Sequence, residues 1–392
     1  MTLPARVLVL GLARSGRAAA AALERRGVEV VGVDRRDGTD EDVRALDDVG
    51  LLVKSPGVPG EHLLVTEAGS RGVPVWSEVE LGYRLLLPSC RLVGVTGTNG
   101  KTTTVELLGA IFRAAGRDVA VAGNVGHPLT GIEPAEWVVC ELSSFQLEDV
   151  HALTCEVAVL LNIEPDHLDR HGTFDAYRDA KLRIFERARA AIVPRGLGLP
   201  GIEFSADDPL PAEPRIPGRH NRENAAAATA AARAAGIPDE AIAEGLAAFR
   251  GVRYRLELVA EVRQVRYVND SKATNVAATR RALATYDAPL RLILGGLPKG
   301  ESFVPLAEAI GPNVRAVYLI GEAADELESA LAAAGAPLER CGDLAVAVAR
   351  TSAAAEPGEI VLLSPACASY DQFDDFEHRG EEFRRLVQNL TG

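Results

Sequence analysis

The stretch that decides the fold is Leu92-Val-Gly-Val-Thr-Gly-Thr-Asn-Gly-Lys-Thr-Thr-Thr104. Its apolar start predicts a strand, its glycines predict a turn between Gly97 and Gly100, and a helix is predicted from Thr102. Backbone N–H groups of such a turn surround an anion at the helix N-terminus, Lys101 adds a positive charge, and the Thr102 hydroxyl can reach a magnesium ion. A nucleotide triphosphate is therefore the predicted ligand. The alternative, a glycine turn with an incidental lysine, is disfavoured by the strand-turn-helix context.

Length and composition describe a globular chain of more than one domain. The chain has 392 residues, of which 47% are hydrophobic and 25% charged, and its formal net charge at pH 7 is -13. A single hydrophobic core rarely extends over so many residues, so several domains are expected. The negative charge argues against nucleic acid or an anionic membrane as the main partner, because both would be repelled.

The cysteines predict a reducing compartment. Their odd number and the lack of C-x-x-C pairs argue against a disulfide framework and against a zinc site. No signal sequence and no apolar run of about 18 residues is evident, so we expect a cytoplasmic protein without membrane insertion. The five cysteines are Cys90, Cys140, Cys155, Cys341 and Cys367.

Lysine is rare in this chain. A compact ammonium that can lose its proton or be modified differs from the planar guanidinium of arginine. Each lysine is therefore a candidate site residue, with chance survival in an arginine-favouring composition as the alternative. Of 42 basic residues only five are lysine: Lys54, Lys101, Lys181, Lys272 and Lys299.

Residues 6–34 predict a strand, a turn, a helix and a second strand. The turn Gly11-Leu-Ala-Arg-Ser-Gly16 is typical of a dinucleotide-binding loop, with Ala13 where a middle glycine is usual. The alternative is a tight strand-to-helix turn without a ligand. A phosphate is expected over the end of the turn and a ribose or base near the end of the second strand, at Ser15, Gly16, Asp34, Arg35 and Arg36.

The order of these patterns predicts an α/β chain of three domains. Residues 1–89 form a Rossmann-like domain with further strands at 51–57 and 73–76 and a helix at 77–87, ending at Pro88-Ser89. Residues 90–250 form a central domain with a P-loop ATPase-like parallel sheet. Residues 251–392 form a second Rossmann-like domain. Its strands are expected at 265–268, 290–294, 314–320 and 359–363, and its helices at about 275–285, 302–310, 322–334, 343–355 and from 376.

Candidate ligands of the central domain lie where its strands end. Glu141 ends one buried strand and His167 follows the next, at 157–161, and parallel sheets bind ligands at the carboxyl ends of their strands. The Thr102 hydroxyl, a carboxylate and an imidazole suit magnesium or manganese beside phosphate better than a closed zinc site. A surface role is the alternative for His167. Lys181 lies in a predicted helix, where its chemistry alone assigns no role.

Further polar groups mark possible binding faces. In the third domain, polar clusters follow three strands, at 269–275, 295–300 and 364–373. In the central domain, Asn221 and Asn224 precede a predicted alanine-rich helix, where they would either bind a base edge or cap the helix.

The sequence resembles the Mur ligases of peptidoglycan precursor synthesis from Gly11 to Gly380. Its phosphate loop alone would also suit folylpolyglutamate synthetase. A D-N-P-R motif, typical of family members that add diamino acids, is absent. The more specific signals are Glu141-Leu-Ser-Ser-Phe-Gln-Leu147, Asp270-Ser-Lys-Ala-Thr-Asn275, Ser364-Pro-Ala-Cys-Ala-Ser369 and Asp371-Gln-Phe373, which are similar to the branch that adds D-glutamate.

The resemblance implies a two-step ligation. ATP phosphorylates the carboxylate of UDP-N-acetylmuramoyl-L-alanine to an acyl phosphate, and the amine of D-glutamate then attacks the carbonyl carbon. The implied cofactors are ATP, two Mg²⁺ ions with Mn²⁺ as a substitute, and a carbamylated Lys181. A monomer is expected.

The same resemblance implies site residues. The expected catalytic residues are Lys101, Glu141, His167 and Lys181, and the expected metal ligands are Thr102, Glu141, His167 and Lys181. ATP is expected at Gly97, Thr98, Asn99, Gly100, Lys101, Thr102, Thr103, Asn221, Asn224, Arg255 and Asp270. The UDP-sugar is expected at Ser15, Gly16, Asp34, Arg35, Ser55, Pro56, Gly57, Asn124 and His167. D-Glutamate is expected at Lys272, Thr274, Lys299, Ser369, Tyr370 and Phe376.

Two departures from the family pattern and two alternative functions stand beside this interpretation. Pro298 occupies a position where relatives usually have Asp, and the chain is short between Lys181 and His220. A sibling ligase or a folylpolyglutamate synthetase is the second enzyme hypothesis. A nucleotide-gated binding protein or a dinucleotide oxidoreductase is the hypothesis from another class, weakened by the missing middle glycine.

Overall fold

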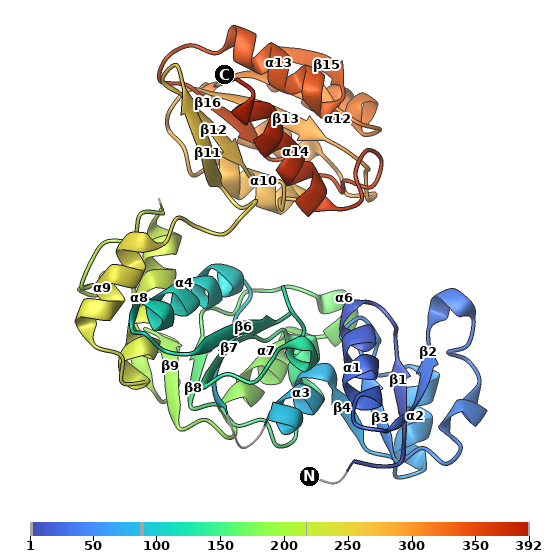
Figure 1. Ribbon diagram of the computed structural model, residues 1–392. Helices are drawn as coiled ribbons and strands as arrows, with labels where there is room; N and C mark the ends of the chain where they lie inside the picture. The colour runs from blue at the N-terminus through green and yellow to red at the C-terminus, as the bar shows by residue number, and fades with distance from the viewer. Residues whose placement is uncertain (1–2, 87–89, 125, 217, 391–392) are drawn as a thin grey trace. The chain divides into compact units, whose positions relative to one another are not determined.

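The computed structural model describes residues 3–86, 90–124, 126–216 and 218–390. The chain divides into two compact units, Met1–Phe249 and Arg250–Gly392 (Figure 1). The predicted boundary at Pro88-Ser89 lies outside the described residues. None of the helices in the described ranges is long and apolar enough to cross a membrane.

The first unit begins with a four-stranded parallel sheet of order β2-β1-β3-β4. Apolar residues of α1 and α3 pack on one face of this sheet, and those of η2 and α2 pack on the other. Both faces are covered, as in doubly wound folds, which agrees with the mainly apolar strands. The elements are β1 (Arg6–Leu10), α1 (Arg14–Glu24), β2 (Glu29–Val33), η1 (Arg35–Asp37), η2 (Val43–Leu46), β3 (Leu51–Lys54), α2 (Leu63–Ser70), β4 (Val75–Ser77) and α3 (Glu78–Leu86).

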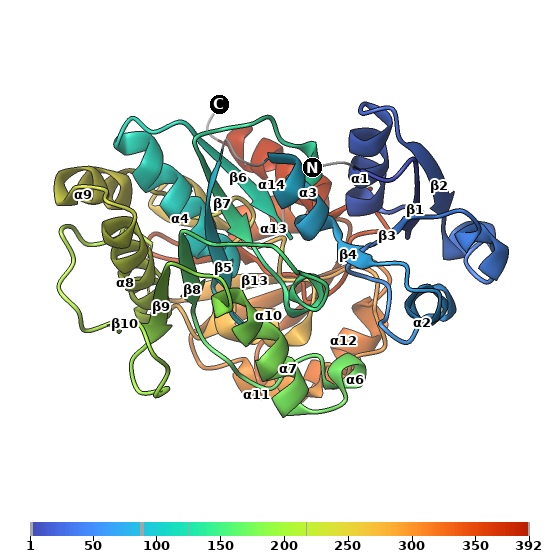
Figure 2. The same cartoon turned by 90° about the horizontal axis from the view of Figure 1, so that it is seen from below.

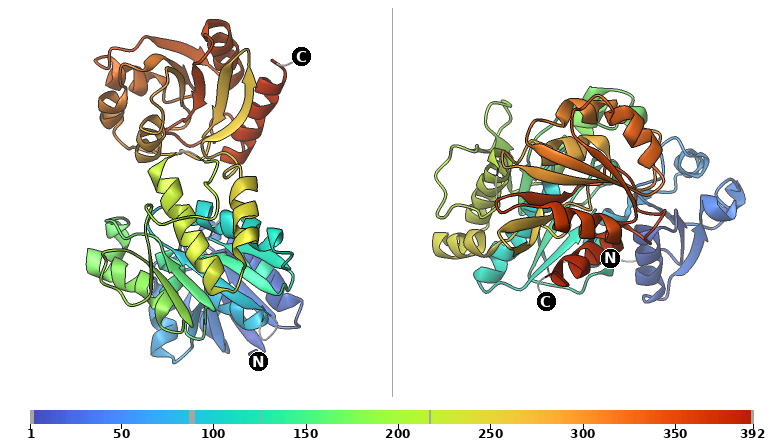
Figure 3. Two further views of the ribbon diagram at one scale, coloured as in Figure 1. Left: turned by 90° about the vertical axis from the view of Figure 1, so that its left-hand side faces the viewer. Right: turned by 90° about the horizontal axis from the view of Figure 1, so that it is seen from above.

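The first unit continues with a six-stranded parallel sheet of order β10-β9-β8-β5-β7-β6. Helices α4, α8 and α9 contact one another, and α8 and α9 lie side by side in the left view of Figure 3. The short helices α6 and α7 are adjacent (Figure 2). The strands are β5 (Arg91–Thr96), β6 (Val119–Gly123), β7 (Trp137–Glu141), β8 (Val157–Leu160), β9 (Ala190–Pro194) and β10 (Ile202–Phe204). The helices are α4 (Lys101–Ala114), η3 (Leu129–Gly131), α5 (Ser144–Leu147), α6 (Leu168–His171), α7 (Phe174–Leu182), η4 (Arg183–Phe185), α8 (Arg219–Ala234) and α9 (Asp239–Ala248).

The second unit holds a six-stranded sheet of order β11-β12-β16-β13-β14-β15, in which β11 runs antiparallel to β12 and the other pairs are parallel. Apolar residues of α10, α11 and α12 pack on one face, and those of α13 and α14 pack on the other. The strands are β11 (Glu257–Val262), β12 (Val265–Asn269), β13 (Leu290–Gly295), β14 (Val314–Ile320), β15 (Leu338–Gly342) and β16 (Ile360–Leu363). The helices are α10 (Val276–Leu283), α11 (Val304–Ala309), α12 (Ala324–Leu331), α13 (Leu344–Ala354) and α14 (Phe376–Gln388).

The predicted α/β class with parallel sheets is confirmed. Sequence patterns did not indicate the two edge strands of the second unit, β11 and β15. Both edges are largely exposed or half-buried, so neither carries the apolar run that marks a central strand.

Candidate functional site

The phosphate loop joins β5 to α4 as predicted. Gly97 and Gly100 have positive φ angles of 155° and 84°, which favour glycine. A Cβ at Gly100 would lie 2.3 Å from Oδ1 of Asn224, so the first turns of α8 pack directly on the loop. The Asn99 N–H donates to Oδ1 of Asn162 beyond β8 at 2.8 Å. The loop is therefore held from two neighbouring elements.

A hydroxyl, a carboxylate and an amide meet at the start of α4. The Thr102 hydroxyl donates to Oε2 of Glu141 at 2.8 Å, and Nδ2 of Asn124 donates to Oε1 of Glu141 at 3.2 Å. Thr102 and Glu141 are both buried. No group of three or more His, Cys, Asp or Glu side chains able to hold a metal occurs among the described residues. Two protein oxygens beside a phosphate loop fit Mg²⁺, which commonly takes its other ligands from waters and substrate phosphates.

Two lysines meet at one carbonyl oxygen of the phosphate loop. Nζ of Lys101 and Nζ of Lys181 each donate to the Gly97 oxygen at 2.8 Å. Lys181 is 2% exposed and its ammonium lies 4.6 Å from the ring centroid of Tyr177. Burial, helped by the charge of Lys101, lowers the pKa of Lys181 to about 7. One of the five lysines is therefore a buried amine beside the phosphate loop, with a pKa near neutrality.

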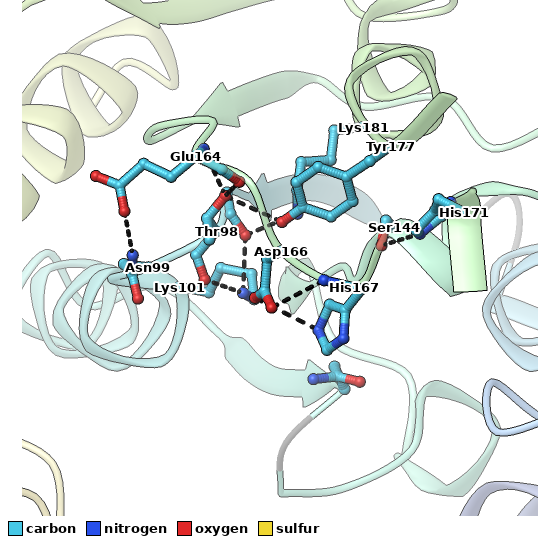
Figure 4. A network of polar contacts seen from close by, with 12 residues as sticks. Thr98, Asn99, Lys101, Ser144, Glu164, Asp166, His167, His171, Tyr177 and Lys181 are labelled. Atoms are coloured by element: carbon cyan, nitrogen blue, oxygen red, sulfur yellow. Dashed lines mark hydrogen bonds and ion pairs between the residues drawn. The ribbon is translucent and has the colours of Figure 1, made fainter. Parts of the chain in front are cut away.

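Among the described residues, His167 makes no hydrogen bond or ion pair with Thr102, Glu141 or Lys181, with which it was expected to share a metal. It is the N-cap of α6, with a positive φ of 52°, and its side chain is 50% exposed. Its ring lies 4.9 Å from that of Phe145, and Nε2 is 3.6 Å from Oδ2 of Asp166. Figure 4 shows His167 beside Asp166, while Thr98 links Glu164 to Tyr177 above Lys101.

A cavity of about 960 Å³ opens at the carboxyl ends of β1, β2 and β3. Most of the predicted UDP-sugar residues line it, whereas Gly16 and His167 are not among its walls. Residues without a sequence signal also line it, from the first turns of α1 and α2 and from irregular segments between β2 and α2. The predicted lining residues are Ser15, Asp34, Arg35, Ser55, Pro56, Gly57 and Asn124, and the additional ones include Arg14, Asp40, Glu41, His62 and Leu63.

The turn at the mouth of this cavity depends on Gly16 and Asp34. A Cβ at Gly16 would lie 1.8 Å from the Gly11 oxygen, so only glycine fits there. Asp34 accepts N–H groups from Arg36 at 2.9 Å and Leu12 at 2.5 Å. These two hydrogen bonds, that of Arg36 first, lower the pKa of the Asp34 carboxyl. Asp34 therefore shapes the turn as well as lining the cavity.

Asn221 and Asn224 do not cap α8. The helix begins at Arg219, with Gly218 as its N-cap and no side-chain cap hydrogen bond, so the capping alternative is wrong. Both asparagines lie in the first turns of the helix. Asn224 is buried against Gly100.

The second unit brings its predicted nucleotide residues together around a buried carboxyl. Asp270 accepts the Ser364 hydroxyl at 2.7 Å and the Leu256 N–H at 3.2 Å, and burial raises the pKa of Asp270 to about 7. Arg255 precedes Leu256 and follows Tyr254, and these two neighbours have positive φ angles of 46° and 62°. Such angles are strained for residues of this size.

The predicted D-glutamate residues are more loosely associated. Nζ of Lys272 lies 5.9 Å from the ring centroid of Phe376. Ser369 is buried and Thr274 half-buried, whereas Lys299 and Tyr370 are exposed. The structure does not bring the side chain of Lys299 into a hydrogen bond or ion pair with the described residues.

Sequence reasoning missed Arg379, which holds two of these polar loops together. Its guanidinium is completely buried and donates to the Ser271 hydroxyl at 3.0 Å and to the oxygens of Ser271 at 2.9 Å, Cys367 at 3.2 Å and Ala368 at 3.2 Å. Burial lowers the pKa of Arg379 to about 10. An arginine in a charged terminal helix gives no sequence signal of such burial.

Comparisons with known proteins agree on one family. Residues 95–195 match the Mur ligase middle domain, and residues 254–367 match the Mur ligase glutamate ligase domain. UDP-N-acetylmuramoylalanine–D-glutamate ligase of Anaeromyxobacter dehalogenans is 43% identical, with 97% of each chain covered. The ligase of the same name from Bacillus subtilis is 36% identical, with 98% of this chain and 97% of that one covered.

A solved structure shares the fold. The UDP-N-acetylmuramate–alanine ligase of Thermotoga maritima superposes with a TM-score of 0.65 at 18% identity, covering 98% of this chain and 99% of that one. At that identity the likeness supports the fold, while the curated relatives support the family. The chain belongs to the Mur ligase family, in its UDP-N-acetylmuramoylalanine–D-glutamate ligase branch.

Proposed function

We propose that this chain uses ATP to join D-glutamate to the alanine carboxylate of UDP-N-acetylmuramoyl-L-alanine, releasing ADP and phosphate. One observation supports the proposal most. Asn124 lines the 960 Å³ cavity and also donates to Glu141, and Glu141 accepts from Thr102 of the phosphate loop. A nucleotide sugar bound in the cavity would therefore have its distal carboxylate beside the γ-phosphate of ATP.

In the first step an oxygen of the alanine carboxylate attacks the γ-phosphorus, and the bond between that phosphorus and the ADP oxygen breaks. Lys101 neutralises charge on the transferring group. A divalent cation held by Thr102 and Glu141 would supply further neutralisation and orient the phosphates. The buried setting of these two side chains strengthens their electrostatic effect, because the local dielectric is low.

In the second step the amine of D-glutamate attacks the acyl carbon, phosphate leaves, and the nitrogen loses a proton as the amide forms. Exclusion of water matters here, because hydrolysis would waste the acyl phosphate. We assign D-glutamate binding to Lys272, Thr274, Lys299, Ser369, Tyr370 and Phe376.

We also propose that Lys181 carries a carbamate and, with His167, holds a second Mg²⁺ or Mn²⁺. Only a neutral amine adds carbon dioxide, and a pKa of about 7 makes that form available at neutral pH. A carbamate would replace a buried cation by an oxygen anion, which magnesium prefers. His167 would have to turn from Asp166 to take part.

The remaining assignments follow the family. We assign ATP to Gly97, Thr98, Asn99, Gly100, Lys101, Thr102, Thr103, Asn221, Asn224, Arg255 and Asp270. We assign the UDP-sugar to Ser15, Gly16, Asp34, Arg35, Ser55, Pro56, Gly57, Asn124 and His167. We propose a cytoplasmic location, with which five free thiols agree, because a reducing compartment keeps thiols unpaired. We also propose that the chain is a monomer. Light scattering on an eluting size-exclusion peak tests the monomer.

An amino-acid panel tests the proposed function. Purified protein with ATP, Mg²⁺ and UDP-N-acetylmuramoyl-L-alanine should release ADP and phosphate in equal amounts when D-glutamate is present. L-Glutamate, L-lysine and diaminopimelate should not replace it. Lys101→Met serves as the inactive control. Folded protein that releases no ADP, or that prefers another amino acid, would overturn the proposal.

A further inference from the structure

The turn that follows β3 is held by an arginine from a distant part of the first unit. Ser55, Pro56, Gly57 and Val58 line the 960 Å³ cavity. Nη1 of Arg170 donates to the Pro56 oxygen at 2.6 Å, and Nη2 donates to the Val58 oxygen at 2.7 Å. Arg170 itself is not part of the cavity wall. Any effect of Arg170 on a ligand must therefore act through the turn.

The guanidinium of Arg170 is fixed by two further contacts. Its Cζ lies 4.0 Å from the ring centroid of Phe145, and its Nη2 lies 3.7 Å from Oε2 of Glu148. The side chain is only 14% exposed. A planar fork that stacks on an aromatic ring and donates to two carbonyls has no equivalent in lysine, which offers a point charge.

The Glu148 carboxylate also connects the start of the Ser55–Val58 turn to α6. Lys54, the residue before the turn, is 2% exposed and lies 2.7 Å from Oδ2 of Asp149 and 3.5 Å from Oε2 of Glu148. His171, next to Arg170 in α6, lies 3.3 Å from Oε1 of Glu148. Contacts at both ends of the turn thus run to Glu148 and its neighbours.

We propose that Arg170 is a positioning residue for the nucleotide-sugar substrate, acting by holding the Ser55–Val58 turn in its binding conformation. The inference rests on the proposed function, which places the UDP-sugar in this cavity. Helix α6 also begins directly after His167. Arg170 therefore connects the wall of the substrate cavity to the segment that carries a proposed catalytic side chain.

The test compares Arg170 with a matched arginine. Arg183 likewise donates to two carbonyls, those of Glu148 and Val150, but in the described part of the chain it makes no hydrogen bond or ion pair with the Ser55–Val58 turn. Arg170→Ala, Arg170→Lys and Arg183→Ala are compared with wild type. The measurements are the calorimetric Kd of UDP-N-acetylmuramoyl-L-alanine without ATP, and KM for each of the three substrates.

Loss of two charge-assisted hydrogen bonds predicts that Kd and KM for the UDP-sugar rise about tenfold in both Arg170 variants. KM for ATP and for D-glutamate should stay within about twofold of wild type. Guanidinium ion should partly restore UDP-sugar binding by Arg170→Ala and should have no effect on the Kd of wild type or of Arg183→Ala. Arg183→Ala should lower thermal stability while leaving the Kd unchanged.

Two results would overturn the inference. One is an unchanged Kd in both Arg170 variants. The other is an equal loss in all three KM values together with the thermal shift that Arg183→Ala shows, which would indicate a general structural role. Failure of the proposed function is distinct from both, because wild-type protein itself would then neither bind the UDP-sugar nor release ADP.

Discussion

Replacing Lys181 should abolish an activity that small carboxylic acids can partly restore. A lysine with its ordinary pKa is neutral in about one molecule in three thousand at pH 7. Burial lowers the pKa of Lys181 to about 7, so about half of the molecules carry a neutral amine that can add carbon dioxide. Because a carbamate would supply an anionic oxygen at the proposed phosphoryl-transfer centre, Lys181→Ala should lower kcat about a hundredfold or more, or ~2.7 kcal/mol.

The assay is ADP release with and without added bicarbonate, formate or acetate. Formate and acetate should partly restore Lys181→Ala by placing a carboxylate in the vacated space, and Lys181→Arg should be inactive without rescue. Lys54→Ala is the matched control for rescue, since Lys54 is also 2% exposed but pairs with Asp149 and Glu148. Carboxylic acids should therefore not restore activity to this variant. Full activity of Lys181→Ala would refute the carbamate, as would equal rescue of Lys54→Ala.

Three other perturbations test separate parts of the molecule. Burial raises the pKa of Asp270 to about 7, so the protonated carboxyl stabilises the folded state. This contribution to the free energy of unfolding, up to about 4 kcal/mol, is fully present below about pH 4 and is lost as the pH rises through 7. Asp270→Asn should remove this pH dependence of stability in denaturant titrations. Gly16→Ala places a Cβ 1.8 Å from a carbonyl oxygen, so calorimetry should show UDP-sugar binding weakened about tenfold or more. Gly69→Ala is the control: its added Cβ would have no atom within 4 Å, so it should not weaken binding. Thr102→Val removes the hydroxyl that donates to Glu141 and should raise the Mg²⁺ concentration needed for half-maximal ADP release. Thr104→Val should leave that concentration unchanged, because the buried Thr104 hydroxyl has no hydrogen-bond partner in the described structure.

Each of these expectations has a contradicting result. Parallel pH profiles for wild type and Asp270→Asn would mean that this carboxyl does not change its pKa on folding. Unchanged UDP-sugar affinity in Gly16→Ala would place the substrate away from the first turn of α1. An unchanged Mg²⁺ requirement in Thr102→Val would remove its hydroxyl from the metal site.

The parts of the site that could be predicted from the sequence are encoded in short stretches. The phosphate loop requires glycines at fixed positions because Gly97 and Gly100 have positive φ angles. Glu141 was predictable because a carboxylate at the end of an apolar strand needs a polar partner, which the Thr102 hydroxyl supplies. The rarity of lysine singled out Lys181 before its burial was known.

The parts that could not be predicted depend on contacts between distant segments. Arg170 is separated from Pro56 by 114 residues, and no local pattern distinguishes it from the other arginines. Arg379 lies in a helix rich in charged residues, and arginine is rarely fully buried. The cavity walls around Asp40 and His62 come from irregular segments between β2 and α2, whose course periodicity does not reveal.

A buried carboxylate at the start of α3 links the two sheets of the first unit. Glu80 is completely buried and accepts the N–H groups of His151 at 2.9 Å, Ala152 at 2.8 Å and Leu153 at 3.1 Å. Because α3 follows β4 directly, these hydrogen bonds join the Rossmann-like sheet to the loops of the central sheet. Each charge-assisted hydrogen bond contributes about 1.5–3 kcal/mol, so separating the sheets would lose these three bonds and leave Glu80 only its ion pair with Arg84 in the same helix. Packing within the first unit therefore fixes the position of the cavity relative to the phosphate loop.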